Sequence, residues 1–116
     1  MVSEKTILWR QKYASFIRKW QDIVLDLRLR MTQESWSNDK LEMEILQKIE
    51  NQRIKNVFSF TKDYIYHNKK GSFRNFMYEV YLEIINFGVI EPGRLYAIEK
   101  AIVSAKKKMK WKDQKN

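Results

Sequence analysis

The chain has 116 residues, a formal net charge of +9 and a pI near 9.8. Its length suffices for one domain with a modest core. The absence of cysteine excludes disulfides, thiolate nucleophiles and cysteine-based zinc sites. No window approaches the run of about 18 apolar residues that a membrane span requires, and the first residues lack a signal-peptide pattern. We therefore expect a soluble, cytoplasmic protein.

Apolar residues recur every three or four positions between about 4 and 31, which predicts one long helix. Its predicted inward stripe consists of Trp9, Tyr13, Phe16, Trp20, Val24, Leu27 and Met31. The opposite side of this helix carries Ile7, Leu25 and Leu29. We interpret these three side chains as a candidate interface with a second copy of the chain or with another protein.

A second helical pattern covers 39–67, after a short polar loop that ends in a helix cap. Its apolar positions are interrupted by the polar residues Gln47, Asn51, Gln52 and Asn56. This polar stretch is compatible with an exposed face, a kink or a break, and the sequence does not decide among them. The segment from His67 to Gly71 supplies cations and a glycine that end the helix.

Two further helices are expected at 73–87 and 92–112. Ser72 is predicted to cap the first of them and Gly88 to end it, while Pro92 suits the first turn of the second. The 73–87 pattern is apolar on nearly all sides, so we expect it to be the central, most buried helix. The sequence thus predicts an all-α fold: one domain over 1–116, a bundle of about four helices with 113–116 as a disordered tail.

The predicted last helix combines aromatic rings with lysines on one side. Tyr96, Lys100, Lys107 and Trp111 fall roughly opposite its apolar stripe. They are flanked by Lys108, Lys110 and Lys112. Lysines neutralise phosphates and release counterions, and aromatic rings stack on base faces, so this pattern is typical of nucleic-acid binding without sequence readout. The first helix adds Arg10, Arg18 and Lys19 as candidate contacts with a nucleic acid or other polyanion.

Other readings of the same pattern stay open. Tryptophan and lysine together also suit an anionic lipid surface, and lysines near a helix C-terminus can simply complement the helix dipole. The apolar side chains opposite the first stripe instead favour a helical module that binds another protein. The sequence does not distinguish DNA, RNA, acidic protein and lipid as the partner.

The residues that could support catalysis are few. His67 is the only histidine, and the three glycines are isolated, so neither a histidine metal site nor a phosphate-binding loop is indicated. Glu79 and Glu83 could form a carboxylate pair, but we expect them to meet basic residues on a neighbouring helix. We therefore predict no enzyme activity, no metal and no cofactor.

Overall fold

Six α-helices make up the part of the chain that the computed structural model describes, residues 3–115 with side chains through Lys108. The helices are α1 Glu4–Lys12, α2 Ala14–Glu34, α3 Asn38–Lys48, α4 Gln52–His67, α5 Ser72–Phe87 and α6 Pro92–Lys115. The all-α class is confirmed within these residues, whereas the prediction of about four helices is wrong. Among the described residues, each helix is either too short or too polar to span a lipid bilayer.

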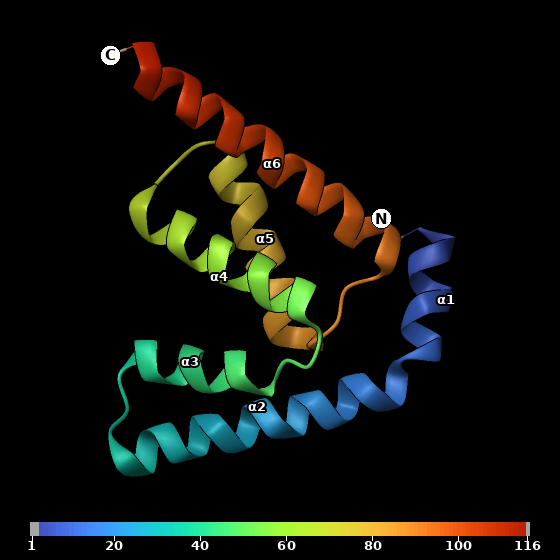
Figure 1. Ribbon diagram of the computed structural model, residues 1–116. Coiled ribbons are helices and arrows are strands. Elements are labelled where there is room, and N and C mark those ends of the chain that lie inside the picture. The colour runs from blue at the N-terminus through green and yellow to red at the C-terminus, as the bar shows by residue number, and fades with distance from the viewer. Residues whose placement is uncertain (1–2, 116) are drawn as a thin grey trace.

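The predicted first helix is divided at Tyr13, whose backbone angles are φ −102° and ψ 13°. The chain turns there, so that α1 stands at an angle to α2 (Figure 1). Neither glycine nor proline marks this bend. α1 buries no residue, whereas α2 buries Ile17 and the residues that follow on its inward side. Phe16, predicted to point inward, is exposed, because Ile17 takes the inward position after the bend.

The predicted second helix is divided between α3 and α4. Ile49 adopts an extended conformation (φ −74°, ψ 121°) that turns its side chain into the core. Asn51 then caps α4, since its side-chain oxygen accepts hydrogen bonds from the backbone N–H groups of Arg53 (2.9 Å) and Ile54 (3.3 Å). The polar stretch in this region is therefore a break followed by a new helix start.

Two helix starts show how local chemistry sets boundaries. α5 is preceded by Gly71, at φ +119°, without a side-chain cap, so the prediction that Ser72 caps this helix is wrong; Ser72 is its first helical residue. α6 begins at Pro92, as predicted. The Glu91 carboxylate accepts hydrogen bonds from two first-turn amides of α6, at 3.1 Å each.

The core centres on α5, which packs against both α4 and α2 (Figure 1). Met77, Val80 and Ile84 on this helix are completely buried, in agreement with its predicted central place. The indole Nε1 of Trp20 donates a buried hydrogen bond to the carbonyl of Ile85, at 2.7 Å. Because that carbonyl lies in the last turn of α5, it has no partner within the helix, and Trp20 therefore satisfies it across the α2–α5 interface.

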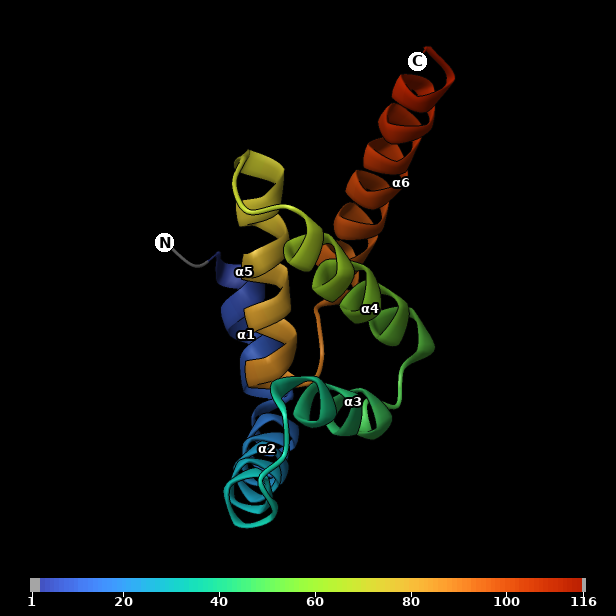
Figure 2. The same cartoon turned by 90° about the vertical axis from the view of Figure 1, so that its left-hand side faces the viewer.

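α6 crosses the α4–α5 pair at the end of the molecule opposite α2 and α3 (Figure 1). The buried residues Leu95, Ile98 and Ile102 anchor this helix to the rest of the protein. Beyond them the helix extends past α4 and α5 (Figure 2) and ends at Lys115. The predictions of a single domain over 1–116 and of a disordered tail over 113–116 stay predictions. Between Pro92 and Lys108, most of the other side chains of α6 are exposed.

Candidate polyanion-binding surface

One side of α6 presents alternating cations and apolar groups to solvent. Successive steps of four, three and four residues place Tyr96, Lys100, Val103 and Lys107 on the same side of the helix. Tyr96 is 58% exposed and Val103 is 52% exposed, and both lysines are exposed. We call these four residues the outer face of α6. It lies opposite the buried side that anchors the helix.

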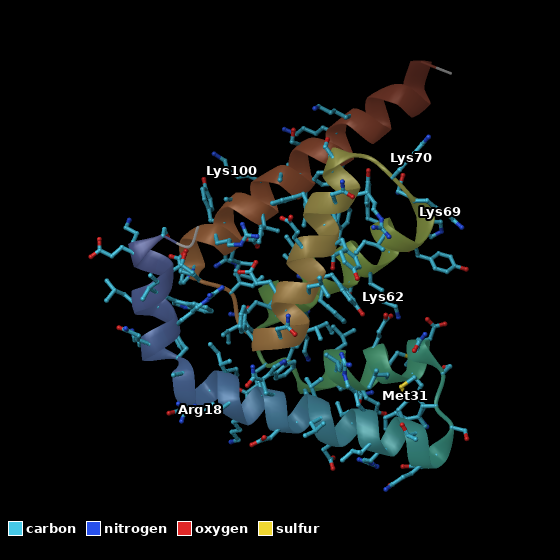
Figure 3. All side chains as sticks on the ribbon, turned by 180° about the vertical axis from the view of Figure 1, so that it is seen from behind. Arg18, Met31, Lys62, Lys69, Lys70 and Lys100 are labelled. Atoms are coloured by element: carbon cyan, nitrogen blue, oxygen red, sulfur yellow. The ribbon has the colours of Figure 1, made fainter. Side chains whose placement is uncertain are left out.

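An ammonium group and an aromatic ring are neighbours on this outer face. The Nζ atom of Lys100 lies 5.2 Å from the centroid of the Tyr96 ring. Lys100 projects from α6 away from the body of the protein (Figure 3). The pair is therefore a surface feature, with its charge and its ring both accessible to a ligand.

The carboxylate next in sequence to Lys100 is held away from the outer face. Arg53 of α4 donates to both oxygens of Glu99, from Nε to Oε2 at 3.1 Å and from Nη2 to Oε1. This hydrogen bonding lowers the pKa of Glu99 and raises that of Arg53. The negative charge of Glu99 is thus compensated on the α4 side and detracts little from the cations on the outer face. Sequence patterns gave no signal for this pair, because it depends on how α4 and α6 pack.

Further lysines flank the outer face. The Nζ atom of Lys106 lies 5.2 Å from the ring centroid of Phe60 on α4, which holds its side chain along the α4–α6 seam. Lys108 is exposed. The stretch 100–108 contains no acidic residue, and its lysines are Lys100, Lys106, Lys107 and Lys108. The side chains of Lys110, Trp111 and Lys112 lie outside the described residues, so their part in the surface stays a prediction.

The structure does not bring the cations of the first predicted helix to the outer face of α6. The guanidinium carbon of Arg10 lies 5.0 Å from the ring centroid of Phe87, at the end of α5. Arg18 lies at the start of α2, far from the C-terminal half of α6 (Figure 3). Lys19 borders a hollow beside α2. A role of Arg10, Arg18 and Lys19 in polyanion binding stays a prediction, separate from the α6 surface.

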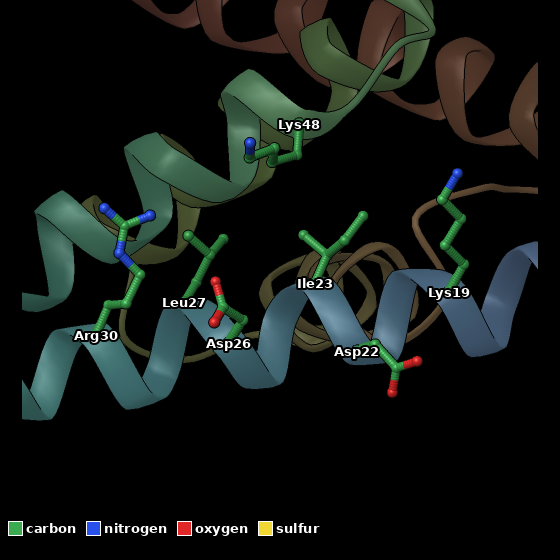
Figure 4. A pocket seen from close by; sticks show the side chains of 7 residues that line it. All are labelled: Lys19, Asp22, Ile23, Asp26, Leu27, Arg30 and Lys48. Atoms are coloured by element: carbon green, nitrogen blue, oxygen red, sulfur yellow. The ribbon is translucent and has the colours of Figure 1, made fainter.

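The hollow beside α2 has a volume of about 300 Å³ and lies between α2 and α3 (Figure 4). It is lined by Lys19, Asp22, Ile23, Asp26, Leu27, Arg30 and Lys48. Its charges are mixed, because two carboxylates and three cations line it, and this weakens attraction for a polyanion. No group of side chains suited to holding a metal ion occurs among the described residues.

Several carboxylates elsewhere form ion pairs or hydrogen bonds with basic or phenolic side chains. Glu83 of α5 pairs with Arg94 of α6 at 2.7 Å, as the sequence led us to expect for this residue. Glu42 accepts a hydrogen bond from the hydroxyl of Tyr81 at 2.9 Å and pairs with Lys62 at 2.8 Å. Burial first, and then this hydrogen bond, raise the pKa of Tyr81. These contacts join α3, α4, α5 and α6 and are structural.

The bend at Tyr13 also divides the candidate interface. Leu25 and Leu29 are exposed on α2, with 58% and 55% of their surface accessible. Ile7 is exposed as well, but it lies on α1, which points in another direction (Figure 1). The three side chains therefore do not form one continuous helix face. Their role as an interface stays a prediction.

No model of a known protein family matches the chain, and no curated protein or solved structure was found to be similar to it.

Proposed function

We propose that the protein binds nucleic acid without reading its sequence, through the outer face of α6 and the lysines beside it. The observation that carries this proposal is the solvent-facing row of Tyr96, Lys100, Val103 and Lys107. The net charge of +9 supports it, because it attracts a polyanion over about a Debye length, about 10 Å at about 0.1 M salt. The corresponding role is that of an accessory protein in a nucleoprotein assembly.

The side chains on this surface favour phosphate groups over base edges. Lysine is a compact point charge that suits phosphate oxygens, whereas arginine, asparagine and glutamine carry planar groups that match base edges bidentately. None of those three residue types occurs between Leu95 and Lys108. Contacts to phosphate position a protein on nucleic acid but carry no sequence information. Binding through this surface is therefore expected to be insensitive to base sequence.

The salt dependence of binding tests the proposal. If the four lysines from Lys100 to Lys108 each neutralise one phosphate, log K falls with log salt with a slope of about −3.6 for a duplex and about −2.8 for a single strand. A fourfold rise in salt then lowers the affinity about 50- to about 150-fold. Fluorescence anisotropy of a labelled oligonucleotide measures this slope. Absence of binding at low salt, or a slope near zero, contradicts the proposal.

A matched pair of double variants separates the α6 surface from general positive charge. Replacing Lys100 and Lys107 by glutamine should reduce the magnitude of the slope by about 1.4 to 1.8. Replacing Lys40 and Lys48 by glutamine removes the same charge from exposed sites on α3, at the opposite end of the molecule (Figure 1). This control should leave the slope nearly unchanged. Equal losses from the two pairs would mean that the outer face of α6 is not the binding surface.

Anionic lipid is the alternative polyanion for the same surface. Pelleting with vesicles that contain phosphatidylserine, compared with vesicles of neutral lipid, measures it directly. Binding to the anionic vesicles that exceeds binding to nucleic acid at the same salt would replace the proposed partner with a membrane surface.

A second candidate function is that of a helical module that binds another protein. It is favoured by the exposure of Leu25 and Leu29, four residues apart on the same side of α2. Light scattering tests self-association through this face. A concentration-dependent mass that returns to that of a monomer when both leucines are replaced by serine supports it. A strict monomer at high concentration counts against a second copy as the partner.

A further inference from the structure

The outer face of α6 carries apolar surface that the core does not use. Leu95, Ile98 and Ile102 already anchor α6 to the body, yet Tyr96 and Val103 leave more than half of their surface in water. These two apolar groups alternate along the helix with the exposed lysines of the same face. Lysines alone would suffice to hold a phosphate backbone, so the exposed ring and isopropyl group are available for a second kind of contact.

The spacing of the ring and the nearest ammonium fits a single nucleotide. Lys100 Nζ lies over the Tyr96 ring, 5.2 Å from its centroid, so a cation and an exposed aromatic ring adjoin each other on this face. A nucleotide joins one phosphate to one base through a single sugar. One nucleotide can therefore place its phosphate against Lys100 and its base against the ring of Tyr96, provided that the base is not already stacked inside a duplex.

The two forms of nucleic acid offer different groups to such a surface. A duplex presents its phosphates, while its base faces are covered by their neighbours in the stack. A single strand presents both, and every base has a face that stacks on an aromatic ring irrespective of sequence. Stacking of one base on an aromatic side chain changes affinity by about fivefold to about 150-fold. Only a single strand can gain this affinity, because the faces of its bases are not covered by a duplex stack.

We infer that the outer face of α6 selects single-stranded nucleic acid over duplex, with Tyr96 stacking on an unpaired base, Lys100 holding the phosphate of that nucleotide and Lys107 holding a phosphate farther along the strand. The inference rests on the proposed function and specifies its substrate class. DNA and RNA single strands share the chemistry that is recognised.

Equilibrium binding to matched oligonucleotides tests this inference. The probes are a single strand, its duplex, the same strand as RNA, and a strand of equal length with abasic sites, which keeps the phosphates and removes the bases. The protein should bind the intact DNA or RNA strand about tenfold more tightly than the abasic strand. It should also prefer these strands to the duplex at the same salt. Comparing DNA with RNA then shows which sugar is preferred.

Variants of Tyr96 link the preference to the ring. Because this side chain is exposed, Tyr96→Ala should leave thermal unfolding nearly unchanged, which circular dichroism verifies. Tyr96→Ala should remove the preference for the intact strand over the abasic strand, and Tyr96→Phe should retain it.

Equal affinity for the intact strand, the abasic strand and the duplex overturns the inference and leaves the proposed function standing. A strand preference that persists in Tyr96→Ala also overturns it, because the ring would not be its source. Absence of binding to every probe at low salt removes the proposed function itself.

Discussion

Substitution of Gly88 by alanine should strongly destabilise the protein. Gly88 ends α5 in the left-handed region, at φ +70°. A Cβ atom there would lie 2.4 Å from Cδ2 and 2.7 Å from Cε3 of the Trp20 ring, closer than real contacts allow. The ring cannot easily move aside, since Trp20 is only 2% exposed and its Nε1 is bonded to the carbonyl of Ile85.

The expected loss has two parts. A left-handed conformation costs an L-residue about 1 kcal/mol, and overpacking a core costs about 1 to 3 kcal/mol. Together they predict a loss of about 2 to 4 kcal/mol in the free energy of unfolding. For a chain of 116 residues, each kcal/mol corresponds to about 4 °C in Tm, so Gly88→Ala should lower Tm by about 8 to 16 °C.

Thermal and urea unfolding, followed by circular dichroism, measure this loss against the two other glycines. Gly93 lies in the first turn of α6, and a Cβ there would meet only the flexible carboxylate of Glu91, at 3.2 Å. Gly93→Ala should therefore be neutral or raise stability by up to about 1 kcal/mol. A Cβ at Gly71 would meet no atom within 4 Å, but alanine there would keep a strained φ of +119°. The stability of Gly71→Ala should therefore lie between those of Gly88→Ala and Gly93→Ala. A Gly88→Ala protein as stable as the wild type would refute the close packing of Trp20 against the end of α5.

Three further predictions concern individual contacts. Asn51→Ala should lower the free energy of unfolding by about 1 kcal/mol in urea, because α4 loses its cap. Trp20→Phe should cost about 1 to 3 kcal/mol, because it leaves the buried carbonyl of Ile85 without its donor. The pKa of Glu99 is lowered in the folded state by its hydrogen bond to Arg53, so the pair stabilises the protein above the unfolded-state pKa. That stabilisation is lost as the pH falls through the folded-state pKa. In Arg53→Gln the free energy of unfolding should therefore depend less on pH over this range.

Each of these predictions has a result that contradicts it. The cap on α4 is disproved if Asn51→Ala is no less stable than Asn75→Ala, which changes an exposed residue inside α5. The role of the indole is disproved if Trp20→Phe unfolds at the same urea concentration as the wild type. The Arg53–Glu99 pair is disproved by identical acid unfolding profiles for the wild type and Arg53→Gln.

Two helix boundaries that local chemistry sets were predictable from the sequence. Gly88 adopts the positive φ that a helix end requires, and Pro92 starts α6 where its missing N–H group needs no partner. Both depend on the conformational limits of one residue. The all-α class was predictable for a related reason, since apolar residues recur at helical spacing along most of the chain.

The two breaks within long helical patterns were not predictable, because tertiary packing decides them. The periodic pattern continues through Tyr13 without glycine or proline, yet the chain bends there, and the guanidinium of Arg10 covers Phe87. The start of α4 had a local signal in Asn51, a good cap residue. The sequence alone does not distinguish this cap from an exposed polar face. The structure does, because Ile49 leaves the helical conformation and its side chain is buried in the core.

The composition of the α6 surface followed from periodicity, but its electrostatics did not. Helical spacing alone places Tyr96, Lys100 and Lys107 on one side. Compensation of Glu99 by Arg53 depends on a residue 46 positions earlier in the chain. The separation of Arg18 from the C-terminal half of α6 likewise depends on how α2 packs against α5.

Amide chemical shifts measured by NMR during titration with a short single-stranded oligonucleotide test most directly whether the outer face of α6 binds nucleic acid. The largest changes are predicted at residues 96–108, with the amides of α3 nearly unmoved. Changes concentrated around Arg18 or around Leu25 and Leu29, with α6 unmoved, would contradict the proposed binding surface.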